Sequence, residues 1–187
     1  MENNDIIYIE RCKEGDGEAF AVLYDRYIDK IYRFVYYKVF EKETAEDIVS
    51  EAFSKAFEHI VGYDETKGSF SSWLYRIARN AVIDHYRGKK ETANIEDIFE
   101  LSYSERFSEK LDAKEVFKKI SEHLESLSPK QREIIILRVW EDLSYKEIAE
   151  ITGASEGSVK MAFLRAIKDI REKFGPLALA LLALMRP

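Results

Sequence analysis

The chain has 187 residues, a length that suits one domain or two small ones. Its single cysteine excludes an intrachain disulfide, and abundant aromatic residues with only three prolines favour long helices over a sheet. The net charge of −6 argues against a uniformly basic nucleic-acid-binding surface, although phosphate responds to local charge. Because the N-terminal segment lacks a signal-peptide core, we expect a cytoplasmic protein without membrane insertion.

The first part of the chain is expected to form a helical bundle. Residues 18–40 carry apolar side chains at helical spacing. A second helix is expected from a capping box of Thr44 and Asp47 to Ile60. Its apolar stripe consists of Ile48, Ala52, Phe53, Ala56 and Phe57.

Residues 61–68 are expected to form a loop, after which Ser69 or Ser71 can cap a third helix that ends near residue 87. One face of this helix carries a polar stripe of Arg76, Asn80, Asp84 and Arg87. Such residues can bind phosphates and base edges, but a solvated helix surface has the same composition. The preceding aromatic residues and Lys67 favour the first interpretation, because aromatic rings stack on unpaired bases.

Charge is segregated along the chain. Residues 67–90 contain a single acid, Asp84, and six basic residues: Lys67, Arg76, Arg79, Arg87, Lys89 and Lys90. Residues 91–125 contain ten acids and five bases. We expect residues 91–111 to form a flexible acidic linker, followed by a helix that leads into the last part of the chain.

Residues 127–174 predict three consecutive helices. Ser128 with Gln131 and Ser144 with Glu147 form two capping boxes. Gly153 can end the second helix in the left-handed conformation, and Ser155 can cap the third. A short glycine turn between two amphipathic helices is typical of the helix-turn-helix, whose second helix enters the DNA major groove.

Three segments in this order resemble the group IV, extracytoplasmic-function sigma factors of bacterial RNA polymerase. They are AEDIVSEAFSKAF (45–57), SFSSWLYRIARNAVIDHYR (69–87) and LSPKQREIIILRVWEDLSYKEIAEITGASEGSVK (127–160). The resemblance implies an all-α protein with two helical bundles. We expect region 2 at 1–90, the linker at 91–111, region 4 at 112–174 and an apolar tail at 175–187.

The resemblance also implies roles for residues of the first bundle. The helix at 45–57 would dock on the basic coiled coil of the polymerase's largest subunit, through Glu46, Asp47 and Glu51. The minus-ten element would be melted and read by the next loop and helix, with Asn80 recognising a flipped base and Tyr63 forming a pocket wall. The expected minus-ten residues are Tyr63, Lys67, Arg76, Arg79, Asn80, Asp84 and Arg87.

The last helix would read the minus-thirty-five element as duplex. Its expected contact residues are Ser155, Ser158, Lys160, Arg165 and Lys168. Family members usually have Ser-Arg after the lysine, whereas this chain has Met161 and Ala162. The loss of that arginine removes a phosphate or guanine contact, so the mean affinity or the element read should differ.

The expected partners are core RNA polymerase, promoter DNA and an anti-sigma protein. The histidines show no metal-ligand spacing and no phosphate-binding glycine loop is present, so we expect no enzyme, cofactor, metal or small-molecule substrate. Two alternatives remain. The chain could be a helix-turn-helix regulator that is independent of core polymerase, or a sigma-like module that titrates an anti-sigma protein.

Overall fold

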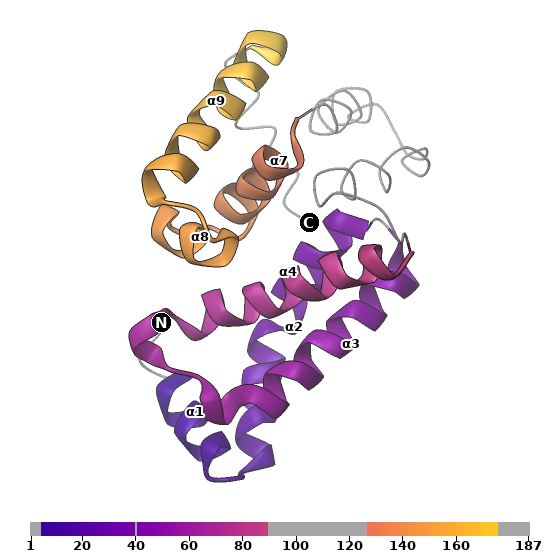
Figure 1. Cartoon of the computed structure of the whole chain (residues 1–187), viewed down its shortest axis with the longest axis vertical. Coiled ribbons are helices and arrows are strands. Elements are labelled where there is room, and N and C mark those ends of the chain that lie inside the picture. The colour runs from indigo at the N-terminus through magenta and orange to yellow at the C-terminus, as the bar shows by residue number, and fades with distance from the viewer. Residues whose placement is uncertain (1–4, 40, 90–126, 176–187) are drawn as a thin grey trace. The chain divides into compact units, whose positions relative to one another are not determined.

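The computed structural model describes residues 5–39, 41–89 and 127–175, and every regular element in these ranges is helical. The chain divides into two compact units. Helices α1 to α4 belong to the first unit, and α7 and α9 belong to the second. Figure 1 shows the helices of each unit. The expected linker, the helix after it and the apolar tail from residue 176 lie outside the described ranges.

The first unit is built on three long helices: α2 (Gly17–Val39), α3 (Lys42–His59) and α4 (Phe70–Lys89). Each of them packs against the other two. Their core is formed by buried aliphatic and aromatic side chains, among them Leu23, Ile31, Phe34, Ile48, Leu74 and Tyr75. The short helix α1 (Asp5–Lys13) packs on α2, where Asp5 pairs with Arg26 and accepts a hydrogen bond from the hydroxyl of Tyr27.

The start and the apolar stripe of α3 differ from the prediction. The helix begins two residues earlier than the expected capping box, and its N-cap residue is Glu41. Thr44 donates a hydrogen bond to the Glu41 carboxylate at 2.7 Å instead of capping the helix, so the predicted box of Thr44 and Asp47 is wrong. Phe57 was expected in the core but is 51% exposed.

The loop between α3 and α4 contains two short 3-10 turns, η2 (Ile60–Gly62) and η3 (Glu65–Lys67). Gly68 follows with a φ of 142°, a conformation that strongly favours glycine. The Oγ of Ser69 accepts a hydrogen bond from the Ser72 amide at 3.2 Å, so Ser69 is the residue that caps α4. The loop is therefore ordered by local hydrogen bonds at both of its ends.

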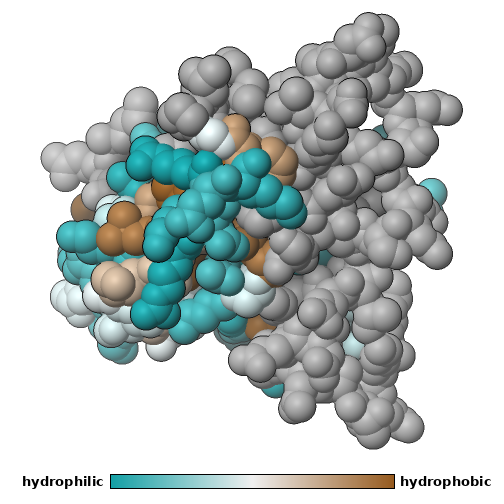
Figure 2. All heavy atoms as spheres, turned by 90° about the horizontal axis from the view of Figure 1, so that it is seen from above, coloured by the Kyte–Doolittle hydropathy of each residue, from teal (hydrophilic) through white to brown (hydrophobic). Residues whose placement is uncertain are grey.

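The last described range contains α7 (Pro129–Ile135), a π-helical segment η4 (Ile136–Trp140), α8 (Tyr145–Thr152) and α9 (Glu156–Phe174), and all of it except residues 150–152 belongs to the second unit. Helix α7 packs against α9. The π-helical end of the first helix was not expected from the sequence. In Figure 2 hydrophilic side chains make up most of the coloured surface, with hydrophobic side chains between them.

The predicted caps of the second unit are confirmed. In both capping boxes the serine hydroxyl accepts a hydrogen bond from the backbone amide three residues later. The side chain of that later residue, Gln131 or Glu147, accepts a hydrogen bond from the serine amide. Gly153 ends α8 with φ 71° and ψ 22° in the left-handed region. The Oγ of Ser155 accepts a hydrogen bond from the Ser158 amide and caps α9.

We expect the substitution Ser144→Ala to lower the free energy of unfolding of the second unit by about 1 kcal/mol, because the N-cap acceptor is lost. Urea unfolding followed by circular dichroism measures the change. Ser144→Thr keeps a hydroxyl acceptor and is the matched control. A loss of the same size in both variants would contradict the role of the cap.

Candidate functional site

The acids predicted to bind core polymerase lie together on the surface of α3. Glu46, Asp47 and Glu51 are all exposed, because the apolar residues of the helix face the core. Glu51 pairs with Lys55 at 2.6 Å, and this hydrogen bond raises the pKa of the Lys55 ammonium. Within the described ranges Asp47 forms no ion pair. Exposed pairs of this kind contribute little stability, so the carboxylates are available to a partner.

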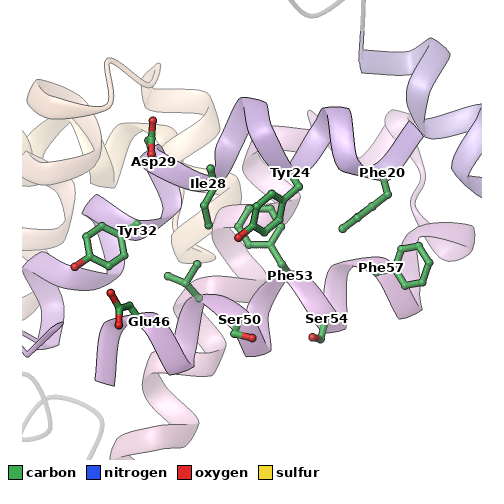
Figure 3. A pocket seen from close by; sticks show the side chains of 11 residues that line it. Phe20, Tyr24, Ile28, Asp29, Tyr32, Glu46, Ser50, Phe53, Ser54 and Phe57 are labelled. Carbon is green, nitrogen blue, oxygen red and sulfur yellow. The ribbon is translucent and has the colours of Figure 1, made fainter. Parts of the chain in front are cut away.

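A groove between α2 and α3 lies next to these acids, and the sequence did not predict it. It has a volume of about 550 Å³, and Glu46 lies in its wall. Figure 3 shows aromatic side chains from α2 and from α3 lining it. The rings of Phe20 and Phe57 lie 5.0 Å apart, and those of Tyr24 and Phe53 lie 4.7 Å apart.

The helical spacing of the apolar residues in 18–40, which include Phe20 and Tyr24, predicts a buried face, and the same reasoning places Phe57 in the core. The structure leaves Tyr24 40% exposed and Phe57 51% exposed. The only signal in the sequence was that both apolar stripes are wider than a helix needs to bury against one neighbour. The acidic face and the aromatic groove together form a mixed surface on α2 and α3, which we call the α2/α3 surface (Phe20, Tyr24, Glu46, Asp47, Glu51, Phe53 and Phe57).

The predicted loop residues Tyr63 and Lys67 differ in exposure. The ring of Tyr63 is buried against Phe70 and Trp73, and its hydroxyl donates a hydrogen bond to the carbonyl of Gly68 at 3.0 Å. The side chain of Lys67 is 78% exposed and lies 3.4 Å from the carboxylate of Asp64. Tyr63 therefore holds the shape of the loop, while Lys67 presents a charge to solvent.

The same loop contains a second local hydrogen-bonded turn. The carboxylate of Asp64 accepts hydrogen bonds from the hydroxyl of Thr66 at 2.7 Å and from its amide at 3.0 Å. These bonds hold the pKa of the Asp64 carboxyl below its usual value, with a smaller contribution from Lys67. The turn keeps the carboxylate charged and fixes the position of η3.

The predicted polar stripe of α4 is continuous along one side of the helix, because its members are three or four residues apart. Asn80, Asp84 and Arg87 are exposed, and Arg76 is half-buried. The guanidinium of Arg87 lies 3.9 Å from the carboxylate of Asp84. Arg79 is half-buried and lies beside the stripe rather than on it. The structure thus presents an amide, an acid and a cation on one accessible face.

The residues predicted to read duplex DNA share the exposed side of α9. Ser158, Lys160, Arg165 and Lys168 are all exposed, and Lys168 lies 3.6 Å from Glu172. Ser155 is also exposed, and its hydroxyl oxygen is the acceptor that caps the helix. The opposite side of α9 contributes to the core through Val159, Ala166, Ile167 and Ile170.

Other kinds of site find little support in the described ranges. No group of three or more histidine, cysteine, aspartate or glutamate side chains there is placed to hold a metal ion. None of the helices in these ranges combines the length and apolar character required to span a bilayer. The accessible chemistry of the described residues consists of polar and charged helix faces and an aromatic groove.

Comparison with protein families gives two matches in chain order. Sigma-70 region 2 matches residues 23–92, and sigma-70 region 4 matches residues 117–170. The first match covers most of α2 together with α3 and α4, and the second includes α7, α8 and most of α9.

Three curated relatives are similar over most of the chain. The ECF RNA polymerase sigma factor SigW of Bacillus subtilis is 35% identical over 178 residues, which cover 88% of this chain and 94% of SigW. BldN of Streptomyces coelicolor is 36% identical over 175 residues, but this chain spans only 62% of its length. The ECF sigma-E factor of Escherichia coli K12 is 33% identical over 189 residues, covering 92% of this chain and 95% of that protein.

Two solved structures share the fold. CnrH, in complex with the cytosolic domain of CnrY, has a TM-score of 0.66 at 21% identity and covers 88% of this chain and 92% of its own. RpoE of Bartonella quintana, in complex with the anti-sigma factor NepR, has a TM-score of 0.63 at 24% identity, with coverage of 82% and 94%. The long and nearly complete match to SigW, with both sigma-70 regions in order, shows that the chain belongs to the extracytoplasmic-function (ECF) RNA polymerase sigma factors.

Proposed function

We propose that the chain binds core RNA polymerase and directs it to promoters, reading the minus-thirty-five element as duplex and the minus-ten element as melted strand. The observation that carries this proposal is that α3, α4 and α9 each expose predicted polar contact residues while their apolar residues fill the cores. The protein itself performs no covalent chemistry, which belongs to the polymerase.

Core polymerase is proposed to bind the α2/α3 surface. Glu46, Asp47 and Glu51 offer carboxylates to the basic coiled coil that the family resemblance implies as partner. The exposed ring of Phe57 adds apolar area beside them. Interfaces commonly combine aromatic anchors with a charged rim, so one partner can bury the groove and pair with the acids.

The minus-ten element is proposed to bind the loop at 61–69 and the polar stripe of α4. Lys67, Arg76, Arg79 and Arg87 would follow the phosphates, and Asn80 would hydrogen-bond to the edge of an unpaired base. Asp84 would orient Arg87, and Tyr63 would hold the loop that forms the pocket wall. Unpaired strands would bind here better than duplex, so binding itself would stabilise the melted promoter.

The minus-thirty-five element is proposed to bind α9 in its major groove. Ser155, Ser158 and Lys160 lie at the N-terminal end of α9, the part of a recognition helix that contacts base edges. Arg165 and Lys168 lie further along the same exposed side and would contact phosphates. The residue limits 1–90, 91–111, 112–174 and 175–187 remain our proposal for region 2, linker, region 4 and tail.

An anti-sigma protein is the further partner that we propose. CnrH and the Bartonella RpoE are each described in a complex, with CnrY and NepR respectively. For this chain, the family resemblance implies a protein that clamps the two units and hides their binding faces. Capture on the immobilised full chain, followed by loss of polymerase binding when the captured protein is added, tests the proposal.

The whole proposal is tested by adding the purified chain to core RNA polymerase and mapping transcription starts on genomic DNA of the source organism. We expect co-elution with core polymerase and a set of starts that core polymerase alone does not produce. Co-elution without new starts would favour the sigma-like module, and the absence of both would refute the proposal.

Binding of a single-stranded minus-ten oligonucleotide should weaken with salt. Each phosphate contact adds about −0.7 to the slope of log K against log salt concentration for single strands. We therefore expect Arg87→Gln to make this slope less negative by about 0.7, whereas Lys30→Gln, at an exposed position on α2, should leave it unchanged. Fluorescence anisotropy across a salt series gives both slopes. Equal slopes for Arg87→Gln and the parent would show that Arg87 does not contact a phosphate of the oligonucleotide.

A further inference from the structure

The exposed side of α9 carries two large apolar side chains among its charged residues. Met161 is 50% exposed and Leu164 is 47% exposed. They are three residues apart on the helix, so their side chains are neighbours on one face. The exposed cations Lys160 and Arg165 are adjacent to them in the sequence.

This apolar pair (Met161 and Leu164) does not belong to the core of the second unit. The core side of α9 is formed by Val159, Ala166, Ile167 and Ile170, all of them buried. A helix that needs only one apolar stripe to fold gains nothing from methionine and leucine on its solvent side. We therefore expect the pair to contact a ligand that offers apolar surface.

The position of the pair on the helix limits what that ligand can be. Helix α9 begins at Glu156, so Met161 lies in its second turn and Leu164 in its third. In a helix-turn-helix the second helix lies in the major groove and its N-terminal half is the part nearest the base edges, so both residues lie close to that end. The flanking cations Lys160 and Arg165 fit a polyanion, since the negatively charged phosphates line the groove. A nucleic-acid duplex with an apolar group exposed in its major groove matches this arrangement.

Thymine supplies that apolar group. Among the four bases it alone carries a methyl group, at C5, and this methyl projects into the major groove. The thioether chain of methionine is flexible and polarisable, so it can adapt to a small apolar partner. Neither Met161 nor Leu164 can form a strong hydrogen bond to a base edge, so their readout must rest on shape and apolar contact.

We propose that Met161 and Leu164 are specificity-determining residues that contact thymine methyl groups in the minus-thirty-five duplex. This inference rests on the proposed function of α9 as the helix that reads that element. The inference predicts that this chain prefers thymine at the base steps that face the apolar pair. The arginine that family members usually have at position 162 would instead favour a phosphate or a guanine.

The test begins with selection of duplexes from a random pool by the full-length chain. In the enriched duplex each thymine is then replaced, one at a time, by deoxyuridine, which removes only the C5 methyl group and keeps the base pair. At one or two positions we expect the dissociation constant to rise about threefold to fivefold, the effect of one buried methyl group. At the other thymines it should not change.

The variant Met161→Ala should bind the thymine and deoxyuridine duplexes with equal affinity at the position that Met161 contacts. Met161→Leu keeps apolar surface and should retain part of the preference. Ile7→Ala, which shortens an exposed apolar side chain on α1, is the matched control and should keep all of it. Circular dichroism of each variant verifies that the helices are intact.

The outcomes separate this inference from the proposed function. An enriched duplex whose thymines can all be replaced by deoxyuridine without loss would overturn the inference alone. Enrichment of no duplex would contradict the reading of duplex DNA by α9, and the inference with it. A preference for the methyl group that survives in both Met161→Ala and Leu164→Ala would also overturn the assignment, because some other residue would then contact the methyl. Conversion of a self-associated species to a monomer by Met161→Ala would reassign the pair to a contact between copies of the chain.

Discussion

The substitution Asp47→Lys is expected to weaken binding of the chain to core RNA polymerase by roughly tenfold to a hundredfold. The carboxylate of Asp47 is exposed on α3 and free of ion pairs within the described ranges, so it can pair with a basic partner. Reversing its charge both removes that attraction and adds repulsion. The dissociation constant can be measured by fluorescence anisotropy with labelled protein and purified core enzyme.

The control for this experiment is Glu14→Lys. Glu14 is an exposed acid between α1 and α2, so this variant changes the net charge by the same amount away from α3. Its affinity for core polymerase should stay within about twofold of the parent. Equal, unweakened binding by both variants would exclude Asp47 from the polymerase interface. A parent chain that does not bind core polymerase would favour a helix-turn-helix regulator, for which the acidic face of α3 has no role.

The substitution Asn80→Ala is expected to reduce transcription from a promoter with an intact minus-ten element by roughly tenfold to a hundredfold. A well-placed side-chain contact to a base edge is worth about 1–3 kcal/mol of discrimination, and the exposed amide of Asn80 is proposed to make such a contact. Binding to core polymerase should be unchanged, because the α2/α3 surface is intact. Single-round transcription and permanganate footprinting of the melted strand measure the effect.

Binding to the minus-thirty-five duplex is the internal control for Asn80→Ala. The variant should lose affinity for a single-stranded minus-ten oligonucleotide and keep its affinity for the minus-thirty-five duplex, which is assigned to the other unit. Unchanged transcription would count for a sigma-like module that does not use DNA. Parallel loss of both affinities would point to a folding defect instead, which urea unfolding would reveal.

The local chemistry of the chain could be predicted with accuracy where a few neighbouring residues determine the backbone. Both serine capping boxes and the left-handed Gly153 are found as predicted. Hydrogen bonds between a side chain and the backbone three residues away depend on little beyond sequence. The same reasoning was wrong at Thr44, where the helix starts at Lys42 and the threonine hydroxyl bonds to Glu41.

The sequence by itself determined an all-helical protein with a helix-turn-helix and segregated charge, because periodicity, caps and charge are properties of short segments. Tertiary structure alone decided which apolar residues stay accessible. Phe57 satisfies the spacing of a core stripe, yet half of it faces solvent beside Phe20. Met161 and Leu164 likewise lie on the open side of α9. A helical period says which residues share a face, but burial depends on whether a neighbouring element covers that face.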